Sequence, residues 1–142
     1  MPIFTFTVDG EPTPKGRPRF AMGGRYPRAY TPKNTKDAEK NIRDFYLYGE
    51  YVGIRPAEVI RKSLTVDLEF YFEPKTRLNE PAEKALKLGR LPHKIRPDID
   101  NLVKLVLDAL NGVAWHDDCQ ISSLTAIKKY AEKSKTKITI SW

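Results

Sequence analysis

The stretch "RPDIDNLVKLVLDALNGVAWHDDCQI", residues 96–121, contains the clearest helix signal in the chain. Apolar residues cover most of the circumference of residues 100–110, and the Asn111-Gly112 pair that follows is a common way to end a helix. We therefore expect a largely buried helix. Asp98 and Asp100 stand at its start, and Asp117 and Asp118 follow its end.

Patterns of period two predict strands on both sides of this helix. Apolar residues alternate with polar ones in residues 3–8 and, for longer, in residues 63–72. The same pattern returns in residues 120–130 and 135–142. These segments are expected to form one sheet.

Two further segments are rich in helix formers. Residues 34–48 follow an N-cap candidate at Asn34 or Thr35, and residues 79–89 carry Pro81 in the first turn with a glycine at the end. The length and this order of elements predict an α+β fold in one domain, residues 1–142. In it, helices pack on a mixed or antiparallel sheet of about four strands.

The composition is basic, with 25 Lys and Arg against 18 Asp and Glu and a net charge of +7. Such an excess favours a polyanionic partner, because each neutralised phosphate releases a condensed counterion. Cys119 is the only cysteine, which excludes an intrachain disulfide and a four-cysteine zinc site. With neither a secretion signal nor a long apolar run, we expect a cytoplasmic protein that does not enter membranes.

Residues 9–33 form a long loop segment rich in Pro and Gly, with interleaved aromatic residues and a one-sided positive charge. Cations would bind phosphates and aromatic rings would stack on unpaired bases, whereas the alternative is a solvated loop pinned to the core by its aromatics. A second basic run ends at Arg96, beside the acids. The candidate DNA contacts are Lys15, Arg17, Arg19, Arg25, Arg28 and Arg96.

The acids allow two interpretations. Asp98 and Asp100 are favoured as helix caps, and Asp100 with Lys104 has the i,i+4 spacing of a stabilising pair. Alternatively, the acids gather around a hard divalent cation, which would relieve their mutual repulsion. The ends of the helix are roughly 15 Å apart, and an extended connection over residues 113–118 is long enough to return Asp118 to the Asp98 end. The sequence permits this return without requiring it.

A magnesium ion held by two or three aspartates would activate water and stabilise charge during phosphodiester hydrolysis, with a nearby lysine as helper. Other catalytic templates are absent: there is no phosphate-binding P-loop, no His-Glu-x-x-His motif and no nucleophile elbow. Cys119 with His116 invites a thiol-catalysis interpretation, and Asp118 with His116 a zinc one. Neither is favoured, because the chain has only two histidines, His93 and His116, and no ligand spacing for a soft metal ion.

The segments "RPDIDNLVKLVLDAL" and "WHDDCQI" resemble the signature of RusA-type Holliday junction resolvases. The resemblance extends over essentially the whole chain, with departures in the N-terminal loop and in residues 73–97. It implies a homodimer that makes paired nicks in four-way DNA junctions during recombination and repair. It also implies that Asp98, Asp100 and Asp118 bind Mg²⁺, with Mn²⁺ as a substitute. Lys104 would be the essential basic residue, and Asp117 would have a lesser role.

Two alternatives remain open. A related nuclease would act on flaps or other branched DNA, and a non-catalytic basic nucleic-acid-binding protein would use its aspartates only to cap a helix. Strand scission that depends on a divalent metal separates the enzymes from the binding protein.

Overall fold

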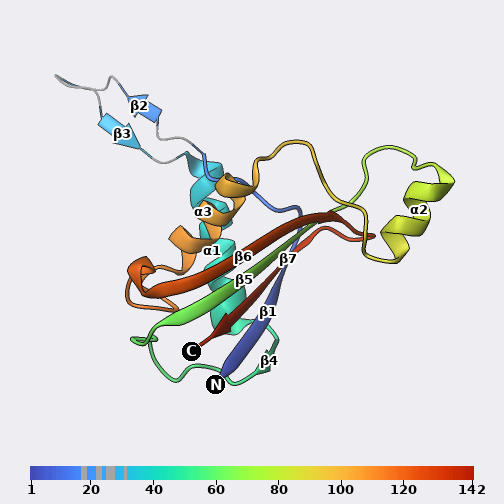
Figure 1. The fold of residues 1–142 in the computed structure, drawn as a ribbon. Helices are drawn as coiled ribbons and strands as arrows, with labels where there is room; N and C mark the ends of the chain where they lie inside the picture. Colours follow the sequence, from blue (N-terminus) through green and yellow to red (C-terminus); the bar gives the residue numbers. More distant parts are fainter. Residues whose placement is uncertain (17–18, 22–23, 25–27, 31) are drawn as a thin grey trace.

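A computed structural model describes residues 1–16, 19–21, 24, 28–30 and 32–142 (Figure 1). Its main sheet has five strands in the order β4-β1-β7-β5-β6. Its three helices are α1 (Lys33–Tyr48), α2 (Glu80–Lys87) and α3 (Ile99–Leu110). The α+β class with a mixed sheet is confirmed, with five strands in place of about four. The strands of this sheet are β1 (Ile3–Asp9), β4 (Tyr51–Gly53), β5 (Leu64–Phe72), β6 (Ile121–Tyr130) and β7 (Lys135–Ser141).

The sheet is mixed because β6 runs parallel to β5 while the other neighbours are antiparallel. Alternate residues of β5 are buried along its whole length, from Leu64 to Phe72. The buried row meets α1 (Lys33–Tyr48) and α3 (Ile99–Leu110), which pack against each other and against the sheet. The opposite row is polar; for example, Thr5 donates to Thr139 across β1 and β7 at 3.1 Å.

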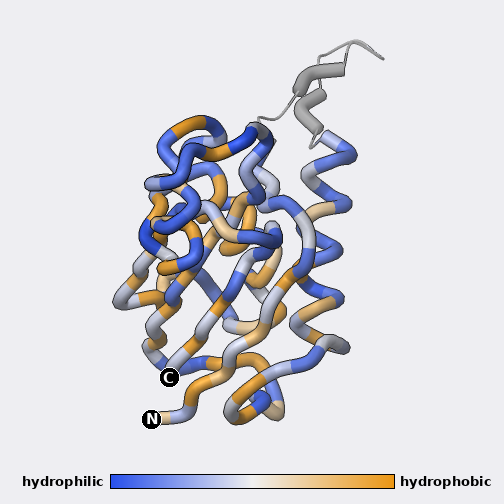
Figure 2. The backbone as a smooth tube through the Cα atoms, turned by 90° about the vertical axis from the view of Figure 1, so that its right-hand side faces the viewer, coloured by the Kyte–Doolittle hydropathy of each residue, from blue (hydrophilic) through white to orange (hydrophobic). Residues whose placement is uncertain are grey.

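The remaining elements lie outside this two-layer core. Strands β2 (Arg19–Ala21) and β3 (Arg28–Tyr30) pair only with each other, and α2 (Glu80–Lys87) has no buried residue. Figure 1 shows α2 beyond one end of the sheet and the β2-β3 pair beyond the start of α1. In Figure 2, α1 is the helix that continues from the grey segment, and much of it is hydrophilic. Among the described residues, no helix combines the length and apolar character needed to cross a membrane.

The predicted N-cap of one helix was wrong, and one short strand was not predicted. Helix α1 begins after Pro32, which makes no side-chain capping bond, whereas Asn34 and Thr35 were the expected caps. Thr35 is fully buried and accepts a hydrogen bond from the Gly16 backbone N–H at 3.0 Å. Its hydroxyl therefore fixes the N-terminal segment. Gly53 lies in β4, a strand that was not predicted from the sequence, and the position requires glycine because its φ is 99° and a Cβ there would clash with the Ile3 carbonyl oxygen.

Candidate active site

The start of α3 presents two exposed carboxylates, those of Asp98 and Asp100. Asp98 is the N-cap residue, yet its side chain makes no capping hydrogen bond. Asp100 lies in the first turn and accepts a 3.0 Å hydrogen bond from the Asn101 backbone N–H. Both residues are exposed. The capping interpretation of Asp98 is therefore wrong as far as its side chain is concerned, and both carboxylates face solvent where a cation or a substrate has access.

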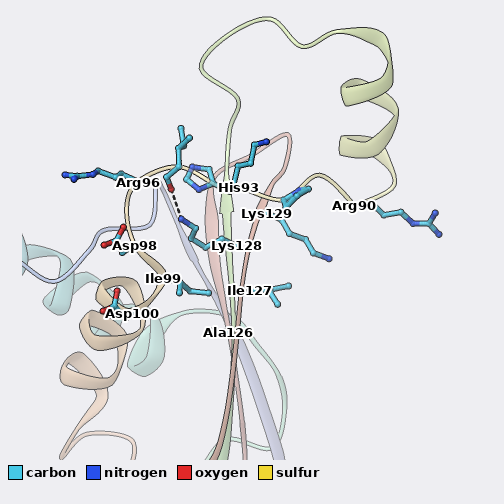
Figure 3. A pocket seen from close by; sticks show the side chains of 13 residues that line it. Arg90, His93, Arg96, Asp98, Ile99, Asp100, Ala126, Ile127, Lys128 and Lys129 are labelled. Carbon is cyan, nitrogen blue, oxygen red and sulfur yellow. Dashed lines mark hydrogen bonds between the residues drawn. The ribbon is translucent and has the colours of Figure 1, made fainter.

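A groove runs between this helix start and the edge of β6. Its wall is residues 90–98, here called the strap, which links α2 to α3. Figure 3 shows Asp98 and Asp100 on the α3 side of the groove with Arg96 above them, and Lys128 between them and the strand. In the described part of the chain, none of the groove's cations forms an ion pair. These cations are Arg90, Lys94, Arg96, Lys128 and Lys129.

The strap is fixed to the sheet by three kinds of contact. The His93 backbone N–H donates to the Lys128 carbonyl oxygen at 3.1 Å, and the Tyr130 N–H donates to the Leu91 carbonyl oxygen at 2.9 Å. The imidazole of His93 is buried and stacks on Phe72, with 4.0 Å between ring centroids. Lys128 Nζ donates to the carbonyl oxygens of Ile95 and Pro97, at 2.6 Å each.

Asp118 lies at the opposite end of α3. Its backbone N–H donates to the side-chain oxygen of Asn111, the residue that ends the helix, at 3.1 Å. The fully buried Trp115 donates from its indole N–H to Asp118 Oδ1 at 2.6 Å. Burial raises the pKa of the Asp118 carboxyl; the Trp115 hydrogen bond opposes this, and the charges of Asp108 and Asp117 add to it. Asp118 is thus a rigidly held, partly buried carboxylate.

Asp117 has a local structural task. It caps the 3₁₀ helix Asp118–Gln120 by accepting the Cys119 backbone N–H, while the Gln120 side chain accepts the Asp117 N–H at 2.7 Å. The Gln120 amide also donates to the carbonyl oxygens of Ile60 and Lys62. This reciprocal cap ties the turn to the segment before β5. It leaves the Asp117 side chain engaged within its own turn.

The expected return of Asp118 to the Asp98 end does not occur within one chain. Asn111 lies eleven positions after Asp100, and at the helical rise per residue this corresponds to about 16 Å along the axis. The connection stays at the far end because Trp115 is buried there and the segment pairs with Ile60. Among the residues that the structure describes, no three His, Cys, Asp or Glu side chains come together as a metal site. One chain brings together Asp98 and Asp100, and leaves Asp118 apart.

The expected basic partners fall into different environments. Lys104 is exposed on α3 and, within the described residues, forms no ion pair with Asp100. Lys15 is 18% exposed and binds Glu39 at 2.6 Å and Asp108 at 3.1 Å, so its ammonium is already neutralised. Burial lowers the Lys15 pKa, but the bonds and charges of the two carboxylates outweigh this and raise it. A structural role thus fits Lys15 better than the expected DNA contact.

Of the other candidate DNA contacts, Arg96 is exposed and lines the groove beside Asp98. Arg17 and Arg25 lie outside the described residues. Arg19 and Arg28 fall on β2 and β3, for which only the strands themselves are described.

The groove residues Lys128 and His93 and the orienting Trp115 were not among the residues predicted from the sequence. A signal was present for Lys128: in the alternating pattern of residues 120–130 it shares a row with Ala126 and Tyr130, on the side that faces the core. A lysine in such a row indicates a specific partner for its charge. For Trp115 no pattern in the sequence pointed to the hydrogen bond with Asp118.

Comparison with known proteins places the chain in a family. A family model described as "Endodeoxyribonuclease RusA" matches residues 9–141. The "Uncharacterized protein YqaN" of Bacillus subtilis (strain 168) is 32% identical over 148 residues, which covers 99% of this chain and 96% of the relative. The family match spans the strap, α3 and the Asp118 turn as well as four strands of the main sheet. The chain belongs to the RusA endodeoxyribonuclease family.

Proposed function

We propose that the protein is a magnesium-dependent endodeoxyribonuclease that cuts four-way DNA junctions by paired phosphodiester hydrolysis, in recombination and repair. The observation that carries the proposal is the start of α3. There, two exposed carboxylates, of which Asp98 makes no capping bond, stand in a groove whose cations form no ion pair among the described residues. Membership of an endodeoxyribonuclease family supports it.

The donor set fits Mg²⁺. This ion is usually held by one or two carboxylates, with water and substrate phosphates completing its shell. Asp98 and Asp100 supply that number of carboxylates at a solvent-exposed position. When bound, the ion would lower the pKa of a water molecule and stabilise negative charge on the phosphate. Mn²⁺ offers similar chemistry and is expected to substitute.

The groove's own residues have separate tasks. Arg96 stands next to Asp98 and is placed to hold a DNA phosphate near the carboxylates, which reduces their repulsion of the backbone. Lys104, one turn beyond Asp100 on α3, is exposed and free to approach the leaving oxygen of a bound strand. The carboxylates themselves would orient the ion and, through it, the water.

Asp118 enters this proposal through a second chain. Since the two ends of α3 separate it from Asp98 and Asp100, a site that uses all three requires Asp118 of a partner. A homodimer with twofold symmetry supplies two such sites, and a four-way junction with near-twofold symmetry requires two cuts. Both needs are met by the same assembly.

The test compares charge-neutral variants of equal size. Asp98→Asn and Asp100→Asn should each lower nicking of a labelled four-way junction in Mg²⁺ by about 100-fold or more, because a lost ligand costs several kcal/mol of charge stabilisation. Junction binding in EDTA should hold or improve, since a negative charge is removed from the groove. Asp37→Asn, an exposed position on α1, makes the same charge change and should leave nicking within a few-fold.

The alternatives predict other outcomes. If the acids only cap a helix, Asp98→Asn and Asp100→Asn should be nearly silent, because Asn caps helices about as well as Asp. A non-catalytic DNA-binding protein would bind the junction without cutting it in either metal. A flap nuclease would cut flaps in preference to four-way junctions when both substrates are offered at equal concentration.

A further inference from the structure

Lys128 occupies an unusual place for a lysine. The register of β6 with β5 pairs Leu68 with Ala126, Phe70 with Lys128 and Phe72 with Tyr130. The three β5 residues belong to the buried core, so Lys128 stands in the row that faces the helices. An ammonium group in this row has to recover the hydration that it loses.

The partners of Lys128 are backbone oxygens of the strap. Its Nζ donates to the carbonyls of Ile95 and Pro97 at 2.6 Å each, and Figure 3 marks one of these bonds. The Pro97 carbonyl belongs to the peptide unit that leads directly into Asp98. Lys128 thereby holds the chain on both sides of Arg96, immediately before the candidate metal ligand.

Asp98 has little else to fix it. Its side chain makes no capping bond, and within the described residues it takes part in no ion pair. Since its carboxylate is free, its position follows from the backbone around residue 98. That backbone is held on one side by α3 and on the other by the Lys128 bonds. A positively charged donor to a carbonyl forms a stronger bond than a neutral one.

We propose that Lys128 is a positioning residue for the nuclease site, which sets the location of Asp98 by clamping the strap. The proposal rests on the proposed function in so far as the site is catalytic. The clamp itself is a statement about the strap and is testable without any cleavage. Lys128 is not proposed to touch the scissile phosphate, because its bonds are made to its own chain.

The experiment compares Lys128→Met, Lys128→Arg and Lys36→Met. Methionine keeps an unbranched apolar side chain close in length to the lysine stem but removes the donor. Lys128→Met should raise hydrogen exchange of the His93 and Tyr130 backbone amides, which join the strap to β6, by about tenfold or more, because the strap opens more readily. Turnover of the junction in Mg²⁺ should fall by about 100-fold, with junction binding in EDTA within a few-fold of the wild type. Lys128→Arg, which keeps charge and donors, should restore a large part of the turnover.

Lys36→Met is the control. It removes the same charge at an exposed position on α1 that does not line the groove. It should leave exchange of the His93 and Tyr130 amides and turnover within a few-fold. If Lys128→Met does not fold, Lys128→Gln, which retains a neutral donor, takes its place with an intermediate effect expected.

Three results would overturn the proposal. Unchanged exchange of the His93 and Tyr130 amides would show that no clamp exists, whether or not the wild type is a nuclease. Raised exchange with wild-type turnover would show that the clamp does not position the site. A loss of junction binding in EDTA as large as the loss of turnover would show that Lys128 contacts DNA. A wild type that never cuts, combined with raised exchange in the variant, would refute the nuclease and leave the clamp in place.

Discussion

The imidazole of His93 lies between two aromatic rings at the end of the sheet. It stacks on Phe72 and contacts Tyr130 at 4.8 Å between centroids, and its buried Nδ1 has no hydrogen-bond partner among the residues that the structure describes. Burial is the largest cause that lowers the pKa of His93; Lys128 and Lys75 lower it further, and Glu11 opposes them. The neutral ring therefore behaves as an aromatic anchor for the strap.

This lowered pKa predicts a pH dependence of stability. The unfolded chain binds a proton at His93 below about pH 6.5, and the folded chain does so only at lower pH. The unfolded state thus holds more protons in that window, so the stability contribution is present above pH 6.5 and is lost as the pH falls through it. The His93→Phe variant should not show this loss. Its free energy of unfolding near pH 7.5 should lie within about 1.5 kcal/mol of that of the wild type.

Urea denaturation at pH 7.5 and pH 5 measures the effect. The wild type should lose more stability between these pH values than the His93→Phe variant does. His116→Gln is the control, because His116 is exposed and its replacement should leave the pH dependence as it is. An equal loss in the wild type and His93→Phe would show that other groups cause the dependence.

At the scale of elements, Lys15 joins three parts of the chain. Its backbone N–H donates to the Asn101 carbonyl at 2.9 Å, and its ammonium binds Glu39 on α1 and Asp108 on α3. The N-terminal segment is thereby held across both helices that cover the sheet. Removing the Lys15 ammonium leaves Asp108 without this counter-charge and leaves Glu39 with its 3.9 Å contact to Arg43, at positions that are only partly exposed.

Lys15→Met should therefore lower the free energy of unfolding by about 2 kcal/mol, and it should leave the salt dependence of junction binding nearly unchanged.

Arg96→Ala should have the opposite pair of effects, because Arg96 is exposed. The free energy of unfolding should stay the same, and the slope of log K for junction binding against log salt concentration should fall by about one. Urea titrations and binding at several salt concentrations check both. A lowered salt slope for Lys15→Met would restore its assignment as a DNA contact.

Most elements could be predicted from periodicity, because burial on one side imposes a repeat on the sequence. The buried row of β5 and the buried face of α3 are examples. Strand β4 is three exposed residues long and carries no such repeat. The capping residue of α1 was mispredicted because the Thr35 hydroxyl does not cap the helix and instead accepts a hydrogen bond from Gly16, a partner 19 residues away. Long-range polar contacts leave no pattern in the local sequence.

The same limit applies to the site. Asp98 and Asp100 could be placed together because they share a helix start, where spacing fixes geometry. The position of Asp118 depends on the irregular connection after α3, in which Trp115 is buried and Ile60 pairs with the chain. Nothing periodic specifies that path. Lys15 was misassigned for a related reason, since its charge was visible in the sequence and its carboxylate partners were not.

At the scale of the whole molecule, the separation of the acids distinguishes two arrangements. Asp118 either acts with Asp98 and Asp100 of a partner chain or does not act with them at all, because α3 keeps the two ends apart. A mixture of two inactive variants tests this directly. In a dimer of Asp98→Asn with Asp118→Asn, one shared site carries both substitutions, and the other site carries neither.

Mixing these two variants should therefore recover nicking, although each alone is inactive. With random exchange of subunits, half of the dimers are mixed and each has one intact site, so about a quarter of the wild-type sites return. The products should be single nicks in place of paired ones, measured on a labelled four-way junction. A mixture of Asp98→Asn with Asp100→Asn is the control: both substitutions fall in the same half of the site, so every site carries one and no activity should return. If the first mixture also stays inactive while both variants are folded and dimeric, Asp118 does not complete its partner's site.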